Sequence, residues 1–226
     1  MAQETSELWN ELWRAKGTAR EYGFEIDGVW YGPEAEVSHK VERGLYQEFG
    51  FGNAETATLE LSLLAENVPR GATVRRFVRL RHEERTSEWL QAGVFFVNRR
   101  SMEDGLWTIE AYDVMRKAEI GWEPRQDLKF PMTMPAAVNE FARIMGCEID
   151  PRTKLNASYK IDYPANDYTI RQELQYIAAA HGGNWIVTGE GKLLLVPLIS
   201  APDETNYLIT EHGRAITLGG VRILVY

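Results

Sequence analysis

The four histidines are the side chains best suited to metal binding or proton transfer near neutral pH. They are His39, His82, His181 and His212. The run His82-Glu83-Glu84-Arg85 begins like a zinc-binding helix motif but lacks the second histidine. None of the four has a histidine, cysteine or carboxylate at the spacing of a known metal motif. We therefore expect no metal ion and no cofactor. We expect His181 to cap a helix, whose dipole favours a partly charged imidazole there.

The cysteine and the carboxylates form no recognisable catalytic motif. Cys147 is the single cysteine and follows Gly146 next to an apolar helix pattern, which is more typical of a small core residue than of a nucleophile. No serine lies in a G-x-S-x-G turn. The neighbouring carboxylates Glu83-Glu84 and Glu103-Asp104 indicate solvated turns rather than a facing acid–base pair. We expect no catalytic residue, so the chain is not expected to be an enzyme.

A cluster of arginines is the strongest local charge signal. Its members are Arg75, Arg76, Arg79, Arg81 and Arg85, with Arg99-Arg100 further along. In a chain with a net charge of −8, this spacing predicts a basic stripe on one face of a sheet. One interpretation is a solvated strand face. The other is an electrostatic contact with an acidic patch on a neighbouring subunit, through Arg75, Arg79 and Arg81. Nucleic-acid binding ranks third, because no aromatic residues interleave on that face.

These residues must be positioned mainly by antiparallel strands. Asp27-Gly28 between two short apolar segments predicts a hairpin with a type I′ turn. Residues 56–64 alternate apolar and polar side chains, which is typical of a strand with one buried face. Further strands are expected at 74–81, 93–97 and 106–112, and again at 185–188 and 192–197 around Gly189-Glu190-Gly191. Gly50-Phe51-Gly52-Asn53 is interpreted as a turn or bulge.

Three amphipathic helices are predicted, at 5–15, 135–145 and 169–181. The last begins with a capping box formed by Thr169 and Gln172, and the second is followed by Gly146. The first carries Trp9 and Trp13 on an apolar stripe, so both are candidate contacts with a neighbouring subunit; the alternative is that the helix folds back on its own domain. The apolar run 219–226 is expected to pair with earlier strands or to continue into a further domain.

Composition restricts the class of protein. With 44% hydrophobic and 26% charged residues among 226, the chain is an ordinary globular protein. Its acidity disfavours nucleic-acid binding. A single thiol suits the reducing cytoplasm in which the chain is expected to be made. Residues 1–13 do not have the pattern of a signal peptide, and no apolar run approaches the ~20 residues of a membrane span.

Several motifs together resemble tail-tip proteins of long-tailed phages and prophages of Gram-positive bacteria. The first group is Glu88-Trp89-Leu90, Gly93-Val94-Phe95-Phe96-Val97, Trp107-Thr108-Ile109-Glu110-Ala111-Tyr112-Asp113 and Lys117-Ala118-Glu119. The second group is Tyr168-Thr169-Ile170-Arg171-Gln172-Glu173-Leu174, Ile177-Ala178-Ala179-Ala180-His181-Gly182-Gly183-Asn184-Trp185 and Gly191-Lys192-Leu193. The resemblance covers residues 22–198 and consists of structural rather than catalytic patterns.

This resemblance to baseplate hub, or tail-associated, proteins implies a trimeric ring whose barrel-like domains continue the tail tube. It also implies a location in the virion tail and contacts with tube and baseplate proteins. Related proteins often carry a wall hydrolase or a fibre-attachment region further along the chain. The acidic charge suits a tube through which DNA slides without sticking.

We therefore predict a strand-rich α+β protein with two domains. Residues 1–118 are expected to form an antiparallel β-barrel-like domain, with 214–226 as a candidate to complete it, and residues 119–213 an α+β domain with two helices and a hairpin. The predicted function is assembly as a homo-oligomer, with a trimer favoured, without specific nucleic-acid binding or membrane insertion. Two alternatives stay open: a tail peptidoglycan hydrolase or peptidase, for example through His181 with Cys147, and a carbohydrate-binding receptor module with exposed aromatic residues.

Overall fold

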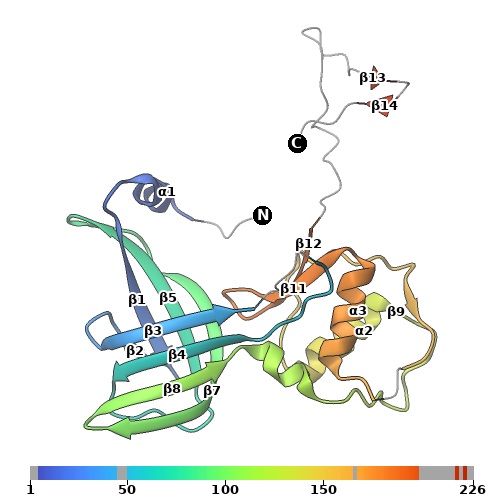
Figure 1. Ribbon diagram of the computed structural model, residues 1–226, viewed down its shortest axis with the longest axis horizontal. Coiled ribbons are helices and arrows are strands. Elements are labelled where there is room, and N and C mark those ends of the chain that lie inside the picture. The colour runs from blue at the N-terminus through green and yellow to red at the C-terminus, as the bar shows by residue number, and fades with distance from the viewer. Residues whose placement is uncertain (1–4, 45–49, 165–166, 199–216, 219–220, 223–226) are drawn as a thin grey trace.

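The computed structural model describes residues 5–44, 50–164, 167–198, 217–218 and 221–222. Its largest element is an eight-stranded antiparallel sheet with the order β2-β1-β5-β7-β8-β4-β3, in which β6 pairs only with β5 (Figure 1). The strands are β1 (Ala19–Ile26), β2 (Val29–Tyr31), β3 (Glu36–Arg43), β4 (Ala57–Leu64), β5 (Thr73–His82), β6 (Arg85–Thr86), β7 (Leu90–Glu103) and β8 (Leu106–Tyr112).

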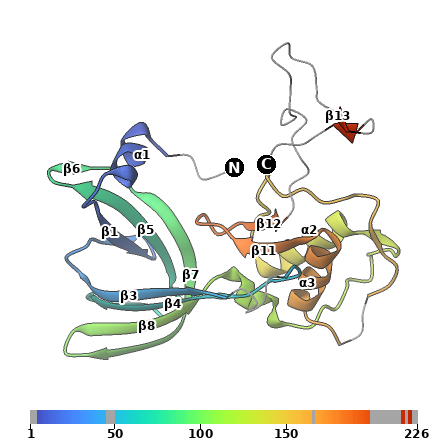
Figure 2. The ribbon, with the colours of Figure 1, turned by 45° about the horizontal axis from the view of Figure 1, so that its top comes forward.

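Helices and short strands form a second, α+β unit beside this sheet (Figures 1 and 2). Its elements are the 3-10 helix η1 (Val114–Glu119), β9 (Met132–Thr133), α2 (Met134–Met145), β10 (Lys160–Ile161), α3 (Ile170–Ala180), β11 (Gly183–Val187) and β12 (Leu193–Pro197). The fold is thus mixed α+β and rich in strands, as predicted. None of the helices in the described part of the chain has the length and apolar character needed to cross a bilayer.

Strand β4 illustrates why these residues form a sheet. Its side chains alternate between the two faces, and those on the inner face are Ala57, Leu59, Leu61 and Leu63, all buried. Burying one leucine side chain stabilises the fold by roughly 1.5–3 kcal/mol. The β1–β2 hairpin also forms as predicted: Asp27 and Gly28 have φ angles of 47° and 87°, and the Asp27 carboxylate accepts a hydrogen bond from the Thr73 amide at 2.9 Å.

The sheet curls strongly but does not close into a barrel. The strand order leaves β2 and β3 as its two edges, without hydrogen bonds between them. Side chains bridge the interior instead: the His39 ring on β3 lies 4.2 Å from the Tyr22 ring and 5.4 Å from the Phe24 ring on β1. The barrel-like domain of the prediction is therefore an open, curved sheet whose ends meet through side chains.

Strand β7 is much longer than predicted from the apolar run 93–97. It spans 14 residues because its second half, which is polar, pairs with β8 around the turn at Asp104-Gly105. The register shifts between Val97 and Arg99, which indicates a bulge at Asn98. Polar side chains on both faces of this half hide the strand period in the sequence.

The α+β unit has its own hydrophobic core. Trp122, Phe141, Leu174 and Trp185 lie at its centre, and the Trp185 indole N–H donates to the Leu174 carbonyl at 2.8 Å. Helix α2 ends at Gly146 in the left-handed conformation, and α3 begins with the predicted capping box. This core also takes up Ala54 and the side chains of η1, which precede the predicted domain boundary at 118/119. By packing, η1 therefore belongs with the α+β unit.

The two units are joined by backbone contacts. The Gly52 amide donates to the Gly183 carbonyl at 2.8 Å, and the Trp185 amide donates to the Asn53 carbonyl at 2.8 Å. The segment predicted as a turn or bulge at 50–53 therefore runs beside β11. On the other side of the hairpin, a Cβ on Gly189 would lie 2.4 Å from the Gln91 carbonyl oxygen, so only glycine allows the β11–β12 turn to approach β7 this closely.

The N-terminal helix α1 (Glu7–Arg14) folds back on the same chain, at the β5–β6 end of the sheet. The Ser6 side chain caps it and donates to the Glu88 carboxylate at 2.7 Å, and Leu12 is buried. At the other end of the chain, β13 (Thr217–Leu218) and β14 (Val221–Arg222) pair with each other. Most of 214–226, which was a candidate to complete the first domain, lies outside the described residues.

Candidate functional site

His181 has both ring nitrogens engaged with the backbone. It forms the C-cap of α3, as predicted; its Nδ1 lies 2.7 Å from the Ile177 carbonyl, and its Nε2 lies 2.9 Å from the Asn156 amide nitrogen. An amide N–H can only donate, so Nε2 accepts and Nδ1 carries the proton. This is the neutral tautomer, whereas the helix dipole favoured a partly charged ring. Neither nitrogen is available as a base in this arrangement.

Cys147 lies in a cleft of about 510 Å³ between the two units, beside Phe96, Glu148 and Lys192. Burial raises the pKa of its thiol to about 11, an effect only partly offset by Lys117. The thiol is therefore protonated at neutral pH, which makes it a poor nucleophile. No hydrogen bond of His181 given by the structure reaches Cys147, so the structure does not bring this suggested catalytic pair together.

His39 lies where the two ends of the curled sheet meet, and its ring contacts other residues of the sheet. Its Nδ1 lies 2.6 Å from a Glu36 carboxylate oxygen, and its Nε2 lies 3.2 Å from the Arg76 guanidinium, which stacks on Tyr22. Burial lowers the pKa of Arg76. His82 lies at the β5–β6 turn, and His212 lies outside the described residues. Within the described ranges, no group of three or more histidine, cysteine or carboxylate side chains is placed to hold a metal ion.

The predicted arginine stripe forms only in part. Arg75, Arg79 and Arg81 share the outer face of β5 and are paired with glutamates of β1. Arg76 lies on the opposite face, against Tyr22 and His39, and Arg85 pairs with Glu11 of α1. Arg79 and Arg81 of β5 contact Glu21 of β1 at 2.7 and 2.8 Å, and Arg75 contacts Glu25. The antiparallel register sets these pairs, because Glu21 lies opposite Arg79 and Glu25 opposite Arg75. The sequence alone did not reveal this register, so it could not predict the pairing.

An aromatic cluster lies beside these ion pairs on the same outer face of the sheet; we call the two together the aromatic surface. The Trp30 ring is 5.3 Å from Phe77 and 5.2 Å from Trp89, both edge to face. The Arg79 guanidinium lies 4.5 Å above the Trp89 ring. Trp30 lies across Gly23, where a Cβ would come within 2.5 Å of its ring. The sequence indicated the arginines of this site, but the expectation that no aromatic residues interleave with them was wrong, because Phe77 lies between Arg75 and Arg79 on the same face of β5.

The two predicted contact tryptophans of α1 lie elsewhere. Trp13 is 57% exposed, and the Arg20 guanidinium is 4.8 Å from its ring. Trp9 is partly buried. Arg20 lies opposite Leu80 on β5, which is the inner face of the sheet, so Trp13 and the aromatic surface lie on different sides. Their use as contacts with a neighbouring subunit stays a prediction.

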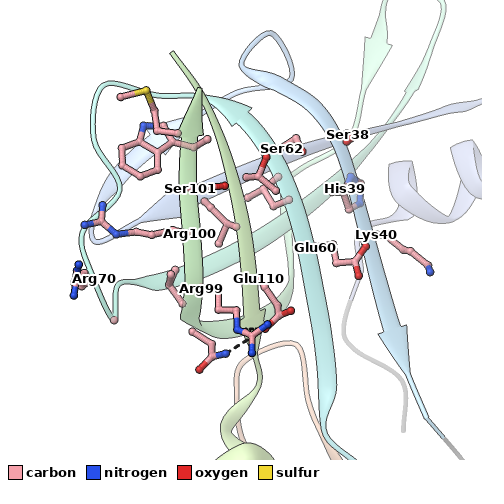
Figure 3. A pocket seen from close by; sticks show the side chains of 18 residues that line it. Ser38, His39, Lys40, Glu60, Ser62, Arg70, Arg99, Arg100, Ser101 and Glu110 are labelled. Carbon is pink, nitrogen blue, oxygen red and sulfur yellow. Dashed lines mark hydrogen bonds and ion pairs between the residues drawn. The ribbon is translucent and has the colours of Figure 1, made fainter. Parts of the chain in front are cut away.

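A polar groove covers the other half of the sheet (Figure 3). It has a volume of about 1030 Å³ and lies over β3, β4, β8 and the second half of β7. The strand registers align one row of hydroxyl groups and one row of charges across these four strands. The first row is Ser38, Ser62, Thr108 and Ser101; the second is Lys40, Glu60, Glu110 and Arg99.

Hydrogen bonds shift the pKa values of titratable residues in this groove. The Glu110 carboxylate accepts from Asn98 at 3.2 Å and from the Tyr112 hydroxyl at 3.0 Å, and these bonds lower its pKa. The same bond raises the pKa of Tyr112. Glu42 raises the pKa of Lys40. This groove was not predicted from the sequence. Alternating polar residues on each strand were visible, but their alignment depends on the register.

Comparison with known proteins gives a fold but no sequence family. No family model and no curated protein matches the chain in sequence. Among solved structures, the 43 kDa tail protein of prophage MuSo2 from Shewanella oneidensis has a TM-score of 0.54 and 11% identity, over 85% of this chain and 57% of that protein. The tail protein from Neisseria meningitidis MC58 has a TM-score of 0.52 and 14% identity, over 84% of this chain and 58% of that protein.

A third structure, prophage tail protein gp18 from Listeria monocytogenes EGD-e, has a TM-score of 0.44 and 14% identity over 84% of this chain and 55% of that protein. The chain therefore spans less than two thirds of the length of these neighbours. The Neisseria and Shewanella matches mean that the fold does not single out Gram-positive hosts. Over most of its length, this chain has the fold of phage and prophage tail proteins.

Proposed function

We propose that this protein is a structural subunit of a phage or prophage tail, located in the virion tail and made in the host cytoplasm. The observation that carries the proposal is the shared fold, which extends over 84–85% of the chain in two tail proteins. The finer assignment is a tail-tip or baseplate hub subunit that self-associates, as a trimer, and connects the tail tube to baseplate or fibre components. The hub motifs of the sequence support that assignment.

The side-chain arrangement favours assembly over catalysis. The aromatic surface combines tryptophan and arginine, the residue types that dominate energetically important protein contacts. By contrast, His181 uses both ring nitrogens on the backbone, and Cys147 has a thiol pKa of about 11. We therefore propose that this chain itself has no enzymatic activity. Wall-degrading activity of the purified chain that Cys147→Ala and His181→Ala both abolish would overturn this part.

One observation favours a second function. The polar groove presents hydroxyl, carboxylate and guanidinium groups over about 1030 Å³, a set that can hydrogen-bond a chain of sugar hydroxyls. A carbohydrate-binding module is therefore the second candidate. Binding of host-wall glycans in a glycan array, lost in the groove variant Glu60→Gln, would support it. Array silence together with ring formation would favour the assembly function.

The decisive experiment on the first proposal is the oligomeric state of the full chain. Light scattering coupled to size exclusion, over a range of protein concentrations up to about 1 mM, detects self-association with a binding free energy as small as about 4 kcal/mol. We expect a discrete trimer, visible as a ring in negative-stain electron microscopy. A strict monomer at every concentration would contradict self-association.

A further inference from the structure

The rim of the aromatic surface presents positive charge to solvent although each of its arginines is paired. The side chains of Arg75 and Arg81 are 43% and 55% exposed, whereas those of their partners Glu25 and Glu21 are only 27% and 14% exposed. The surface thus has three arginines against two glutamates, and the arginines are the outer members. Its centre is apolar, with Trp30 45% exposed. An aromatic centre within a polar rim is the anatomy of a protein-binding surface.

The opposite chemistry occurs at the tip of the β7–β8 hairpin. Leu64 is 51% exposed there, which is unusual for a large apolar side chain, and it lies on the outer face of the sheet. Met102 is also exposed, but it lies opposite Trp107 in the row of the buried Leu63, on the inner face. Leu64 lies in the same row as Leu106 and Glu103 across the sheet. Glu103, Asp104 and Glu66 are exposed acidic residues of this region, and residues 102–105 include no basic side chain. We call this region the acidic tip.

The aromatic surface and the acidic tip cannot meet within one chain. Trp89 immediately precedes β7, and Met102 and Glu103 end it. At about 3.3 Å per residue along β7, Glu103 lies about 45 Å from Trp89 and about 30 Å from Val94, the residue opposite Arg75. Figure 1 shows the hairpin tip at the lower edge of the curled sheet, far from the β5–β6 end where α1 lies. Between two copies of the chain, however, the acidic tip of one copy can reach the aromatic surface of the other.

We infer that the acidic tip of one copy docks on the aromatic surface of the next. Leu64 packs on the exposed Trp30, and Glu103 and Asp104 approach Arg75 and Arg81. The partner is a second copy of this chain, since it carries the complementary charge and apolar side chains. Such a contact joins two different surfaces head to tail. Repeating it generates a closed ring when the rotations between successive copies add up to one full turn. This inference rests on the proposed function and names the surfaces by which self-association occurs.

A charge exchange tests the pairing of the two surfaces. Light scattering of the full chain is compared for the wild type, Arg81→Glu, Glu103→Lys and the double variant. Each single variant should weaken self-association at least tenfold, because like charges then face each other, and the double variant should restore most of the loss. Glu123→Lys, an exposed site on the α+β unit, is the control with the same charge change and should leave association unchanged.

The apolar part of the contact is tested by Trp30→Ala, with Trp13→Ala as the matched control. Trp30→Ala should weaken association roughly 30-fold or more, as expected for a central tryptophan. Trp13 is more exposed than Trp30 but lies on α1, so its replacement should have little effect. A loss with Trp13→Ala as large as that with Trp30→Ala would assign the contact to α1 and overturn the inference.

The failure of this inference is distinguishable from that of the proposed function. An oligomeric wild type that Arg81→Glu, Glu103→Lys and Trp30→Ala all leave intact overturns the docking geometry alone. Single variants that dissociate without recovery in the double variant also overturn the pairing. A wild type that is monomeric up to about 1 mM overturns both self-association and the inference. Circular dichroism melting of every variant separates loss of association from loss of folding.

Discussion

Across β2, β1 and β5 the outer face of the sheet is aromatic, whereas across β8, β4 and β3 the same face carries hydroxyl groups and charges. The inner faces of both halves are alike, with Phe24, Val74, Leu61 and Ile109 buried in one core. The difference lies entirely in the outward positions of the same alternating pattern. Inward residues specify the fold, and outward residues specify the chemistry that each half presents to its surroundings.

The largest expected difference between the two halves is seen when the loss of an aromatic side chain on one half is compared with the loss of a hydroxyl group on the other. Trp89→Ala removes the contacts with Trp30 and Arg79 and should lower the free energy of unfolding by about 2–3 kcal/mol. Thr108→Ala on the polar half should change it by less than about 0.5 kcal/mol. Urea denaturation followed by circular dichroism measures both. Equal effects would mean that the aromatic half is not packed as described.

Acid should act where β8 of the polar half meets η1. Burial raises the pKa of Asp113, which follows β8, from 3.8 to about 6. The folded state then binds this proton more tightly than the unfolded state, so stability should rise as pH falls from about 6 towards about 4. The gain is about 2 kcal/mol, and Asp113→Asn should remove it. Denaturation at a series of pH values checks this; an unchanged pH profile in Asp113→Asn would contradict it.

A smaller effect is expected where the aromatic half needs the absence of a side chain. Gly23→Ala places a Cβ about where the Trp30 ring lies, so the ring must move, at a cost of about 1–2 kcal/mol. Gly121→Ala is the matched control, since a Cβ there has no atom within 4 Å. The free energies of unfolding of both variants, with tryptophan fluorescence for the position of Trp30, test the difference. A stable Gly23→Ala with unchanged fluorescence would sink the idea.

The smallest effect sharpens the description of the polar half. Tyr112→Phe removes the hydroxyl that donates to Glu110, so the pKa of Glu110 should rise towards its ordinary value. The free energy of unfolding should change by less than about 1 kcal/mol. An NMR titration of Glu110 measures the change, and Tyr176→Phe on α3 serves as the control. A Glu110 titration that is identical in Tyr112→Phe and the wild type would exclude this hydrogen bond as the cause.

Local patterns predicted much of the fold. Asp27-Gly28, the alternation from Ala57 to Leu64, and the Thr169–Gln172 capping box each act within a few residues, so the sequence is sufficient to identify them. The polar half of β7 was missed because its side chains show no apolar period. The open form of the sheet was missed because closure depends on how the edge strands β2 and β3 meet, which no local pattern specifies.

The surfaces were harder to predict than the elements, for the same reason. Arg79 and Arg81 were found as a stripe, but their pairing with Glu21 follows from a register between strands far apart in the sequence. The hydroxyl row from Ser38 to Ser101 likewise depends on three separate registers. The side chains of each strand could be identified from the sequence. The sites, however, are formed by side chains from several strands, whose alignment depends on the register.

The backbone pairing of residues 50–53 with β11 also affects the order in which the chain folds during synthesis. The sheet is complete once residue 112 has left the ribosome, whereas Asn53 must wait for Asn184 and Trp185, 131 residues after it. Synthesis of residues 113–185 at 5–20 residues per second takes roughly 4–15 s. The sheet is therefore complete for that time before residues 50–53 can pair with β11. Meanwhile the segment before β4 has no partner strand from β11. Ribosome-stalled chains ending near residue 150 should therefore be cut by protease around residue 52 and be protected once residue 198 has emerged.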